Sequence, residues 1–172
     1  DDVFLEPSAG CGAFVDAVAQ EFQDNEVLSY DIDPKRGDIE RADFLMKDMS
    51  DYSNLITIGN PPFGKRAKLA LEFYEKTMEC SKFVAFIVPV QFNKWGTQRK
   101  VNKDFKLVHN EALDPHSFIF DGKSYPVRST FQVWTRLDVG VDDQRLTKAP
   151  PTTHDDFEMW QHNNTEQSLK YF

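Results

Sequence analysis

A rigid turn at residues 60–63, with the sequence Asn-Pro-Pro-Phe, constrains this chain more than any other feature. Two consecutive prolines fix both φ angles and remove both backbone donors, so neither fits inside a helix or a central strand. The apolar run at residues 55–58 precedes the turn, and a helical pattern follows it. We therefore expect a buried strand to end at this turn. The turn is either an ordinary strand-to-helix connection or a rigid holder for a polar side chain, a carbonyl oxygen and an aromatic ring.

Short apolar strands alternate with helical patterns along the chain, which is typical of a parallel α/β sheet. The expected strands cover residues 3–5, 27–30, a short stretch before residue 42, 55–59, 83–88, 106–113 and 129–137. The expected helices cover residues 13–22 and 67–80, and residues 91–103 are interpreted as a loop with a short helix. An aromatic, turn-rich connection at residues 115–125 separates the last two strands.

Several polar features fall at the carboxyl ends of the expected strands, where parallel sheets bind ligands. A glycine loop at residues 6–12 follows the first strand, but Val15 stands where a dinucleotide fingerprint needs its third glycine, which argues against NAD. Asp31 follows the second strand and could accept hydrogen bonds from a ribose. Asp43 and Phe44 follow the third and could contact a purine. Each acid could instead be a helix cap or turn residue.

Charge is divided unevenly along the chain, although the net charge is −8. Residues 1–59 carry 4 basic and 14 acidic side chains, whereas residues 60–110 carry 10 basic and 4 acidic ones. The basic excess begins at the turn. Such a local field can attract phosphate while the whole protein stays acidic, although a solvated basic face is an equal alternative.

Other sequence features narrow the class of protein. The length of 172 residues suits one domain with a core, and the longest apolar run is too short to cross a bilayer. Two distant cysteines, Cys11 and Cys80, fit reduced thiols, so we expect a cytoplasmic protein. The histidines lack metal-ligand spacing, so no metal is expected; they are His109, His116, His154 and His162.

Four motifs together resemble the S-adenosylmethionine-dependent amino-methyltransferases, in particular bacterial and phage DNA adenine-N6 methyltransferases. The motifs are Leu-Glu-Pro-Ser-Ala-Gly-Cys-Gly-Ala-Phe at 5–14, Asp-Ile-Asp-Pro at 31–34, Ala-Asp-Phe-Leu at 42–45, and the turn at 60–63. The resemblance covers roughly residues 3–138. It implies a Rossmann-like class I methyltransferase fold, with a seven-stranded, mostly parallel sheet whose last strand is antiparallel.

The resemblance also implies roles for named residues. The expected catalytic residues are Asn60, Pro61, Pro62 and Phe63. The expected binding residues for S-adenosylmethionine are Glu6, Pro7, Ser8, Ala9, Gly10, Gly12, Phe14, Asp31, Ile32, Asp43 and Phe44. The expected substrate contacts are Lys65, Arg66, Lys94, Arg99, Lys100, Phe118 and Phe120.

The implied reaction is methylation of the N6 amine of adenine in DNA, as in restriction-modification systems, on a base flipped out of the duplex. The Asn60 side-chain oxygen and the Pro61 carbonyl would accept the two N–H bonds of the amine, and Phe63 would stack on the base. Phe118 or Phe120 would supply a second aromatic face. An alternative of the same chemistry is methylation of a protein glutamine or of ribosomal RNA. An alternative of another class is a non-catalytic, methyltransferase-like DNA-binding or assembly subunit.

Two family features have no counterpart in this sequence. The family has a helix before the first strand, whereas this chain begins in strand-like sequence. It also has a target-recognition region, for which the residues after 138 are too few. We therefore expect residues 1–138 to form the catalytic domain and residues 139–172 to be a linker and C-terminal extension, in which a recognition region would begin. The chain is expected to be a fragment or to act with a separate recognition domain or subunit.

Overall fold

The computed structural model describes residues 2–120 and 122–158, the side chain of Phe120 excepted. The strands are β1 Phe4–Glu6, β2 Val27–Asp31, β3 Glu40–Arg41, β4 Leu55–Gly59, β5 Ser81–Pro89, β6 Lys106–Ala112, β7 Phe118–Phe120, β8 Lys123–Tyr125 and β9 Ser129–Thr135. The helices are α1 Ala13–Glu21, α2 Lys68–Cys80 and α3 Trp95–Gln98, with short 3-10 turns η1 Phe44–Met46, η2 Lys65–Ala67, η3 Val90–Asn93 and η4 Pro115–Ser117.

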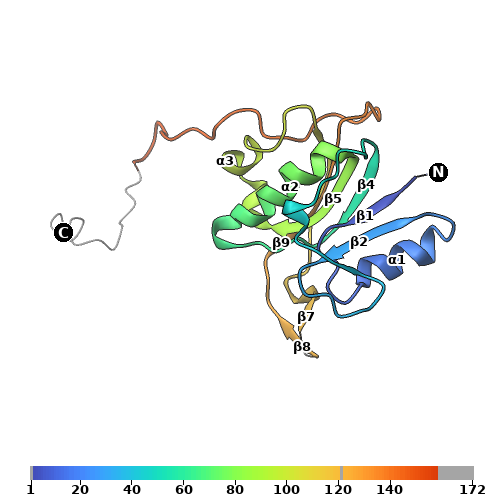
Figure 1. Cartoon of the computed structure of the whole chain (residues 1–172). Coiled ribbons are helices and arrows are strands. Elements are labelled where there is room, and N and C mark those ends of the chain that lie inside the picture. The colour runs from blue at the N-terminus through green and yellow to red at the C-terminus, as the bar shows by residue number, and fades with distance from the viewer. Residues whose placement is uncertain (1, 121, 159–172) are drawn as a thin grey trace.

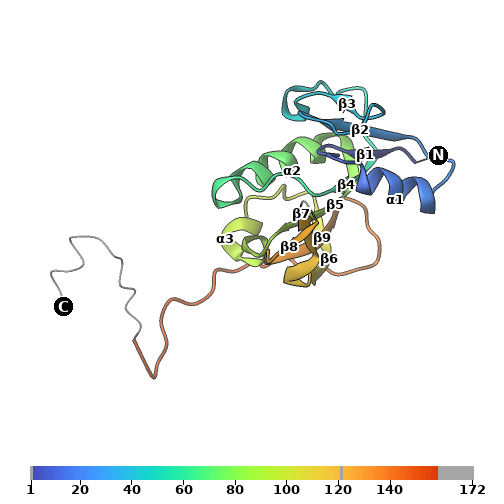
Figure 2. The ribbon, with the colours of Figure 1, turned by 90° about the horizontal axis from the view of Figure 1, so that it is seen from below.

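Seven strands form one sheet in the order β3-β2-β1-β4-β5-β9-β6. The pairs on the β3 side of β5 are parallel, and β9 runs antiparallel between β5 and β6. Helix α1 covers one face of the sheet, and α2 and α3 cover the other (Figures 1 and 2). This confirms the expected Rossmann-like class I methyltransferase fold, with its seven-stranded, mostly parallel sheet and antiparallel last strand.

The core lies between the sheet and α2, where large side chains are fully buried. Tyr74 of α2 makes ring contacts with Phe86, Phe92 and Trp134, whose centroids lie 5.0, 5.2 and 6.2 Å away. All four rings are inaccessible to solvent. Such large aromatic surfaces dominate core energetics, so they fix α2 against the centre of the sheet. The end of β4, and with it the turn at residues 60–63, is thereby fixed as well.

The connection between β6 and β9 contains two strands that the sequence pattern did not predict. Residues 118–120 and 123–125 pair as a small antiparallel hairpin, β7 and β8, separate from the main sheet. Gly122, at φ +72°, lies in the tight turn between them. Each strand has only three residues, which is too few to show an alternating pattern. The hairpin projects beyond the carboxyl end of the sheet (Figure 1).

Residues 143–146 pack against the domain although they lie in the expected linker. The backbone N–H of Gln144 donates to Leu107 of edge strand β6 over 2.8 Å, and the Asp143 carboxylate accepts from the Leu107 N–H over 2.9 Å. The Arg145 guanidinium lies 4.8 Å from the Trp134 ring and donates to the carbonyl of Asn102 over 2.7 Å. This segment therefore covers part of an otherwise open sheet edge.

Candidate active site

A cavity of about 420 Å³ lies at the carboxyl ends of β1, β2, β3 and β4. Its volume is within the range of small-molecule sites. Residues from the loop after β1, from both acidic motifs and from the turn after β4 meet there. The lining residues are Pro7, Ser8, Asp31, Ile32, Ala42, Asp43, Phe44, Leu45, Asn60, Pro62, Leu69 and Phe73. The sequence reasoning missed Leu69 and Phe73, which reach the cavity from α2 and which only tertiary packing could reveal.

Asn60 contributes an unusual polar atom to this cavity. Its Oδ1 is buried and accepts no hydrogen bond from any described residue. A buried acceptor without a partner costs free energy, and native proteins keep few such atoms. The two prolines that follow fix the backbone, so Asn60 cannot easily relax. The atom therefore keeps an unused acceptor at the cavity, with no partner among the described residues.

Phe63 lies on the other side of the same turn. It does not line the cavity, and its ring meets that of Phe118 edge-on, with centroids 6.4 Å apart and planes at 73°. Phe118 belongs to β7 of the hairpin, so two segments 55 positions apart meet at this point. The turn thus separates an acidic cavity from an aromatic pair. The side chain of Phe120, the other expected aromatic, lies outside the described residues.

The glycine loop is held by the loop after β2. Ala9 N–H donates to the Tyr30 carbonyl over 2.8 Å, and Lys35 N–H donates to the Gly10 carbonyl over 3.0 Å. Gly12 adopts φ +85°, and a β-carbon there would lie only 2.4 Å from Nη1 of Arg36. The loop therefore needs glycine at this position for its conformation, and the Arg36 side chain packs closely against it.

Arg36 is a site-supporting residue that the sequence analysis did not single out. Its guanidinium bonds to Asp16 of α1 and Asp38, each over 2.6 Å, and reaches the Gly12 carbonyl over 3.4 Å. These contacts tie α1 to the loop after β2. The spacing between Arg36 and its partner Asp16 is 20 residues, so no local pattern could have revealed it.

The two acids at the cavity already hold backbone groups in place. The Asp31 carboxylate accepts from Gly10 N–H over 2.7 Å and from Asp33 N–H over 2.8 Å, while Asp43 accepts from Leu45 N–H over 3.1 Å at the start of η1. Both act as turn or cap residues and also line the cavity. Each carboxylate oxygen has two lone pairs, so one further donor can still be accepted.

Glu6 lies next to the cavity and not in its lining. It is 1% exposed; its Oε1 accepts from Ser8 N–H over 3.1 Å, and its Oε2 has no partner among the described residues. Burial raises the pKa of this carboxyl to about 8, which the bonds from Ser8 only partly oppose. A β-carbon at Gly59 would lie 2.3 Å from Oε1, so glycine there makes room for the side chain.

The other expected cofactor residues divide between lining and supporting positions. Pro7, Ser8 and Ile32 line the cavity, whereas Ala9, Gly10, Gly12 and Phe14 do not. The last four belong to the loop and the first turn of α1 that support it.

Phe44 lines the cavity, but its ring also packs against other aromatic rings. The ring is 1% exposed and stacks against Tyr30 and Phe73, with centroids 6.0 and 5.9 Å away. The contact of its ring with a purine therefore stays a prediction, and the ring as described packs within the core. Burial in the core stabilises this ring more than contact with a ligand at an open rim would.

The expected phosphate contacts are all exposed, and they lie in two segments. Lys65 and Arg66 belong to η2 directly after the turn, while Lys94, Arg99 and Lys100 flank α3. Arg99 lies 4.9 Å from the Trp95 ring. None of the five forms an ion pair with another described residue.

Neither a family model nor the sequence of a characterised protein matches the chain. Solved structures that are similar to it in fold include three RNA methyltransferases. PH1948 of Pyrococcus horikoshii, assigned as an RNA methyltransferase, is 18% identical with a TM-score of 0.57; the match covers 79% of this chain and 75% of that one. The 23S rRNA methyltransferase ErmE is 17% identical with a TM-score of 0.57, and the 16S rRNA methyltransferase KamB is 14% identical with a TM-score of 0.55.

The matches to ErmE and KamB cover 80% and 78% of this chain. They cover 62% and 87% of the respective neighbours, so the chain spans about three fifths of the length of ErmE. Methyltransferases of this fold use S-adenosylmethionine as the methyl donor.

The cavity residues fit a group of that kind. Asp31 and Asp43 present carboxylate oxygens, which suit hydroxyl and amine donors on a positively charged ligand, and the remaining lining is mostly apolar. Among the described residues, no three metal-ligating side chains come together, and no helix is long and apolar enough to cross a membrane.

Proposed function

We propose that this protein is an S-adenosylmethionine-dependent methyltransferase that methylates the amino group of adenine in RNA. The fold and the cavity support the choice of cofactor. The turn at residues 60–63 supports an amino group on a planar ring as the acceptor. The names of the three structural neighbours support RNA as the substrate class.

The observation that carries this proposal is the unpaired, buried Oδ1 of Asn60 at the edge of the cavity. An exocyclic amine offers the donor that this atom lacks. Its own nitrogen is a weak nucleophile, because the lone pair is delocalised into the ring. Accepting both N–H bonds, one at Asn60 Oδ1 and one at the Pro61 carbonyl, favours a more tetrahedral nitrogen and frees that lone pair.

S-adenosylmethionine, when bound, supplies an electrophilic methyl group. Pro7, Ser8, Asp31, Ile32 and Asp43 would hold it, with the Asp31 carboxylate accepting from ribose hydroxyls. The turn then aims the amine toward the cavity while Phe63, on the outer side, contacts the face of the base. Fixed position and oriented dipoles account for most of the effect in such a site. An amide is not a base at neutral pH, so Asn60 orients the amine and does not deprotonate it.

A second candidate substrate is adenine in DNA. It is favoured by the sequence of the turn and by the order of the motifs, which resemble DNA adenine-N6 methyltransferases. Both substrates need an unstacked base. A duplex must extrude its base, whereas RNA presents unstacked bases in loops. The edge-on pair of Phe63 and Phe118 suits either one.

The test is transfer of a tritiated methyl group from S-adenosylmethionine into separated RNA, DNA and protein fractions of a cell extract. We expect label in RNA, recovered after digestion as N6-methyladenosine, and none with the Asn60→Ala variant. Label only in DNA would select the second candidate. Label on protein glutamine would transfer the same chemistry to an amide substrate. Cofactor binding without transfer to any fraction would contradict the enzyme and support a binding subunit.

A further inference from the structure

The insertion between β6 and β9, residues 114–128, forms a closed arm that we call the hairpin arm. At its base, Val127 N–H donates to the Pro115 carbonyl over 2.8 Å. Ser124 Oγ donates to the His116 carbonyl over 3.1 Å, which joins β8 to η4. These bonds join the two sides of the arm, so it stands out from the sheet as one unit (Figure 1).

The hairpin arm is fixed beside the candidate site at two points. Phe118, at its start, contacts the ring of Phe63 in the turn. Arg128, at its end, accepts a hydrogen bond from Val90 N–H through its carbonyl oxygen over 3.2 Å, directly after β5. The backbone of Arg128 is thereby held at the carboxyl edge of the sheet, while its side chain is exposed.

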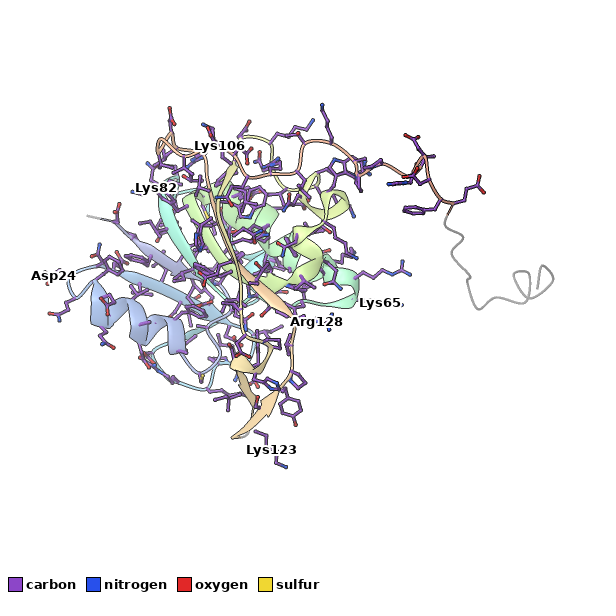
Figure 3. The ribbon with its side chains drawn as sticks, turned by 180° about the vertical axis from the view of Figure 1, so that it is seen from behind. Asp24, Lys65, Lys82, Lys106, Lys123 and Arg128 are labelled. Atoms are coloured by element: carbon purple, nitrogen blue, oxygen red, sulfur yellow. The ribbon has the colours of Figure 1, made fainter. Side chains whose placement is uncertain are left out.

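The charge of the arm is open to solvent at the same edge. Lys123 and Arg128 are exposed and form no ion pair with any described residue, and the same holds for Lys65 and Arg66 after the turn. Figure 3 shows Lys65, Arg128 and Lys123 at the end of the molecule that carries the hairpin. Cations without carboxylate partners are free to bind an anion from outside.

Two lysines at the opposite end of the sheet have carboxylate partners, whereas the exposed Arg136 beside them forms no ion pair with a described residue. Lys82, at the start of β5, pairs with Asp2, and Lys106, at the start of β6, pairs with Asp138 over 3.8 Å. Both lie away from the hairpin in Figure 3. Four cations, Lys65, Arg66, Lys123 and Arg128, are therefore exposed and unpaired among the described residues on the two elements that carry the aromatic pair and its neighbours.

We propose that the hairpin arm is the substrate-recognition element of this site. Lys123 and Arg128 bind phosphates of an RNA strand on one side of the Phe63–Phe118 pair, and Lys65 with Arg66 binds phosphates on the other side. This inference rests on the proposed function, because the target nucleotide then lies between the two groups of cations. Phosphate contacts of this kind fix the register of the strand and leave the base to the aromatic pair.

An RNA strand suits this arrangement better than a small anion. The cations lie on two separate elements, η2 and the hairpin arm, with an aromatic pair between them. A single anion would need convergent donors, whereas a strand offers a phosphate on each side of an unstacked base. Stacking platforms combined with basic surfaces are how proteins bind single strands.

The test compares two double variants in binding to a fluorescein-labelled, adenine-containing single-stranded RNA, measured by anisotropy over a range of salt concentrations. Lys123→Gln with Arg128→Gln removes the two cations of the arm. Lys82→Gln with Lys106→Gln removes two cations at the opposite end and is the matched control. Each lost phosphate contact lowers the log–log salt slope by about 0.7 for a single strand. We expect a slope lower by about 1.4 and about tenfold weaker binding for the arm variant only.

Equal binding by the arm variant and the wild type would overturn the proposal, and so would equal losses in both double variants. Weakened binding of DNA of the same sequence, with RNA binding unchanged, would overturn the choice of RNA. S-adenosylmethionine affinity and melting temperature, measured alongside, should not change in either variant. If RNA binding depends on the arm but no methyl group is transferred, the arm proposal holds and the proposed function is overturned. If RNA is methylated and the arm variant has an unchanged KM for RNA, the proposed function holds and the arm proposal is overturned.

Discussion

The two sides of the turn at residues 60–63 satisfy their charged groups in different ways. On the cavity side, the carboxylates of Asp31 and Asp43 already accept backbone N–H groups. Each basic side chain of the described residues up to 59 has a carboxylate partner; these are Lys35, Arg36, Arg41 and Lys47. On the hairpin side, Lys65, Arg66, Lys123 and Arg128 have no such partners among the described residues.

This difference indicates that the charged groups of the cavity are held in place by bonds within the protein. The cations on the hairpin side lack such partners and can pair with a ligand. The net charge of −8 does not show this uneven distribution, in which the acidic excess precedes the turn and the basic excess follows it. An acidic cavity suits a cationic cofactor, and a basic edge suits a polyanion. One turn separates the two, so each half can be altered without touching the other.

The largest expected effect comes from removing the acceptor that the two halves share. Asn60→Ala should lower methyl transfer by about 10²–10³, the usual cost of losing one oriented polar group in a transition state. Cofactor affinity should change little. The melting temperature should not fall, because Oδ1 has no partner to lose among the described residues. Single-turnover kinetics, calorimetry and thermal unfolding measure these three quantities. An active Asn60→Ala variant would remove the turn from the mechanism.

A second, smaller effect should separate the cavity from its rim. Asp31→Ala should weaken S-adenosylmethionine binding by about 1.5–3 kcal/mol, as expected for a hydrogen bond to a charged group. The matched control is Asp33→Ala, since Asp33 lies two residues further on, is 63% exposed and does not line the cavity. Calorimetry should show near wild-type affinity for the control. Equal losses in both variants would mean that the loop, and not the carboxylate in the cavity, governs binding.

The elements that organise the cavity could be predicted from the sequence because their signals are local. The apolar run before the turn and the acid after β2 each follow from a few consecutive residues, and all fall at one edge of the sheet. The other features of the site depend on contacts between residues that are far apart in the sequence. The Arg36 bonds to α1 and the contact of Phe118 with Phe63 join segments with no shared pattern. The roles assigned to the site residues remain predictions.

Phe44 and residues 143–146 show two further limits of the sequence. A phenylalanine after an acid at a strand end has no local sign of whether its ring faces a ligand or the core, and here it packs against Tyr30 and Phe73. Polar residues after the last strand are typical of a linker, yet Gln144 bonds to the edge strand β6. In both cases the available tertiary partner decided the outcome.

A third prediction concerns Glu6, the buried carboxyl next to the cavity, and tests whether it is protonated in the folded protein. Burial raises the pKa of its carboxyl to about 8 from about 4.5. Between these pH values the folded protein binds a proton at Glu6 that the unfolded chain lacks. The free energy of unfolding therefore decreases as pH rises toward 8. Glu6→Gln cannot ionise and should escape the loss. Its melting temperature relative to wild type should therefore rise from pH 5 to 8, by at most about 5 °C per pH unit. A constant difference would show that Glu6 does not titrate in this window.

The smallest expected effect concerns strain on the hairpin side. Arg66 has φ +56° and ψ +33°, a left-handed conformation that costs a non-glycine residue about 1–2 kcal/mol. Arg66→Gly should relieve this cost, less about 0.5–1 kcal/mol for the greater freedom of glycine in the unfolded chain. The melting temperature should rise by roughly 2 °C.

Arg66→Gln removes the same charge but keeps the strain, so it should weaken RNA binding equally without the gain in stability. Thermal unfolding and anisotropy on the two variants separate these contributions. If the hairpin side is completed by its ligand, stability and RNA affinity will move in opposite directions in Arg66→Gly. If they fall together, Arg66 supports the fold and the contrast between the two sides of the turn does not extend to this residue.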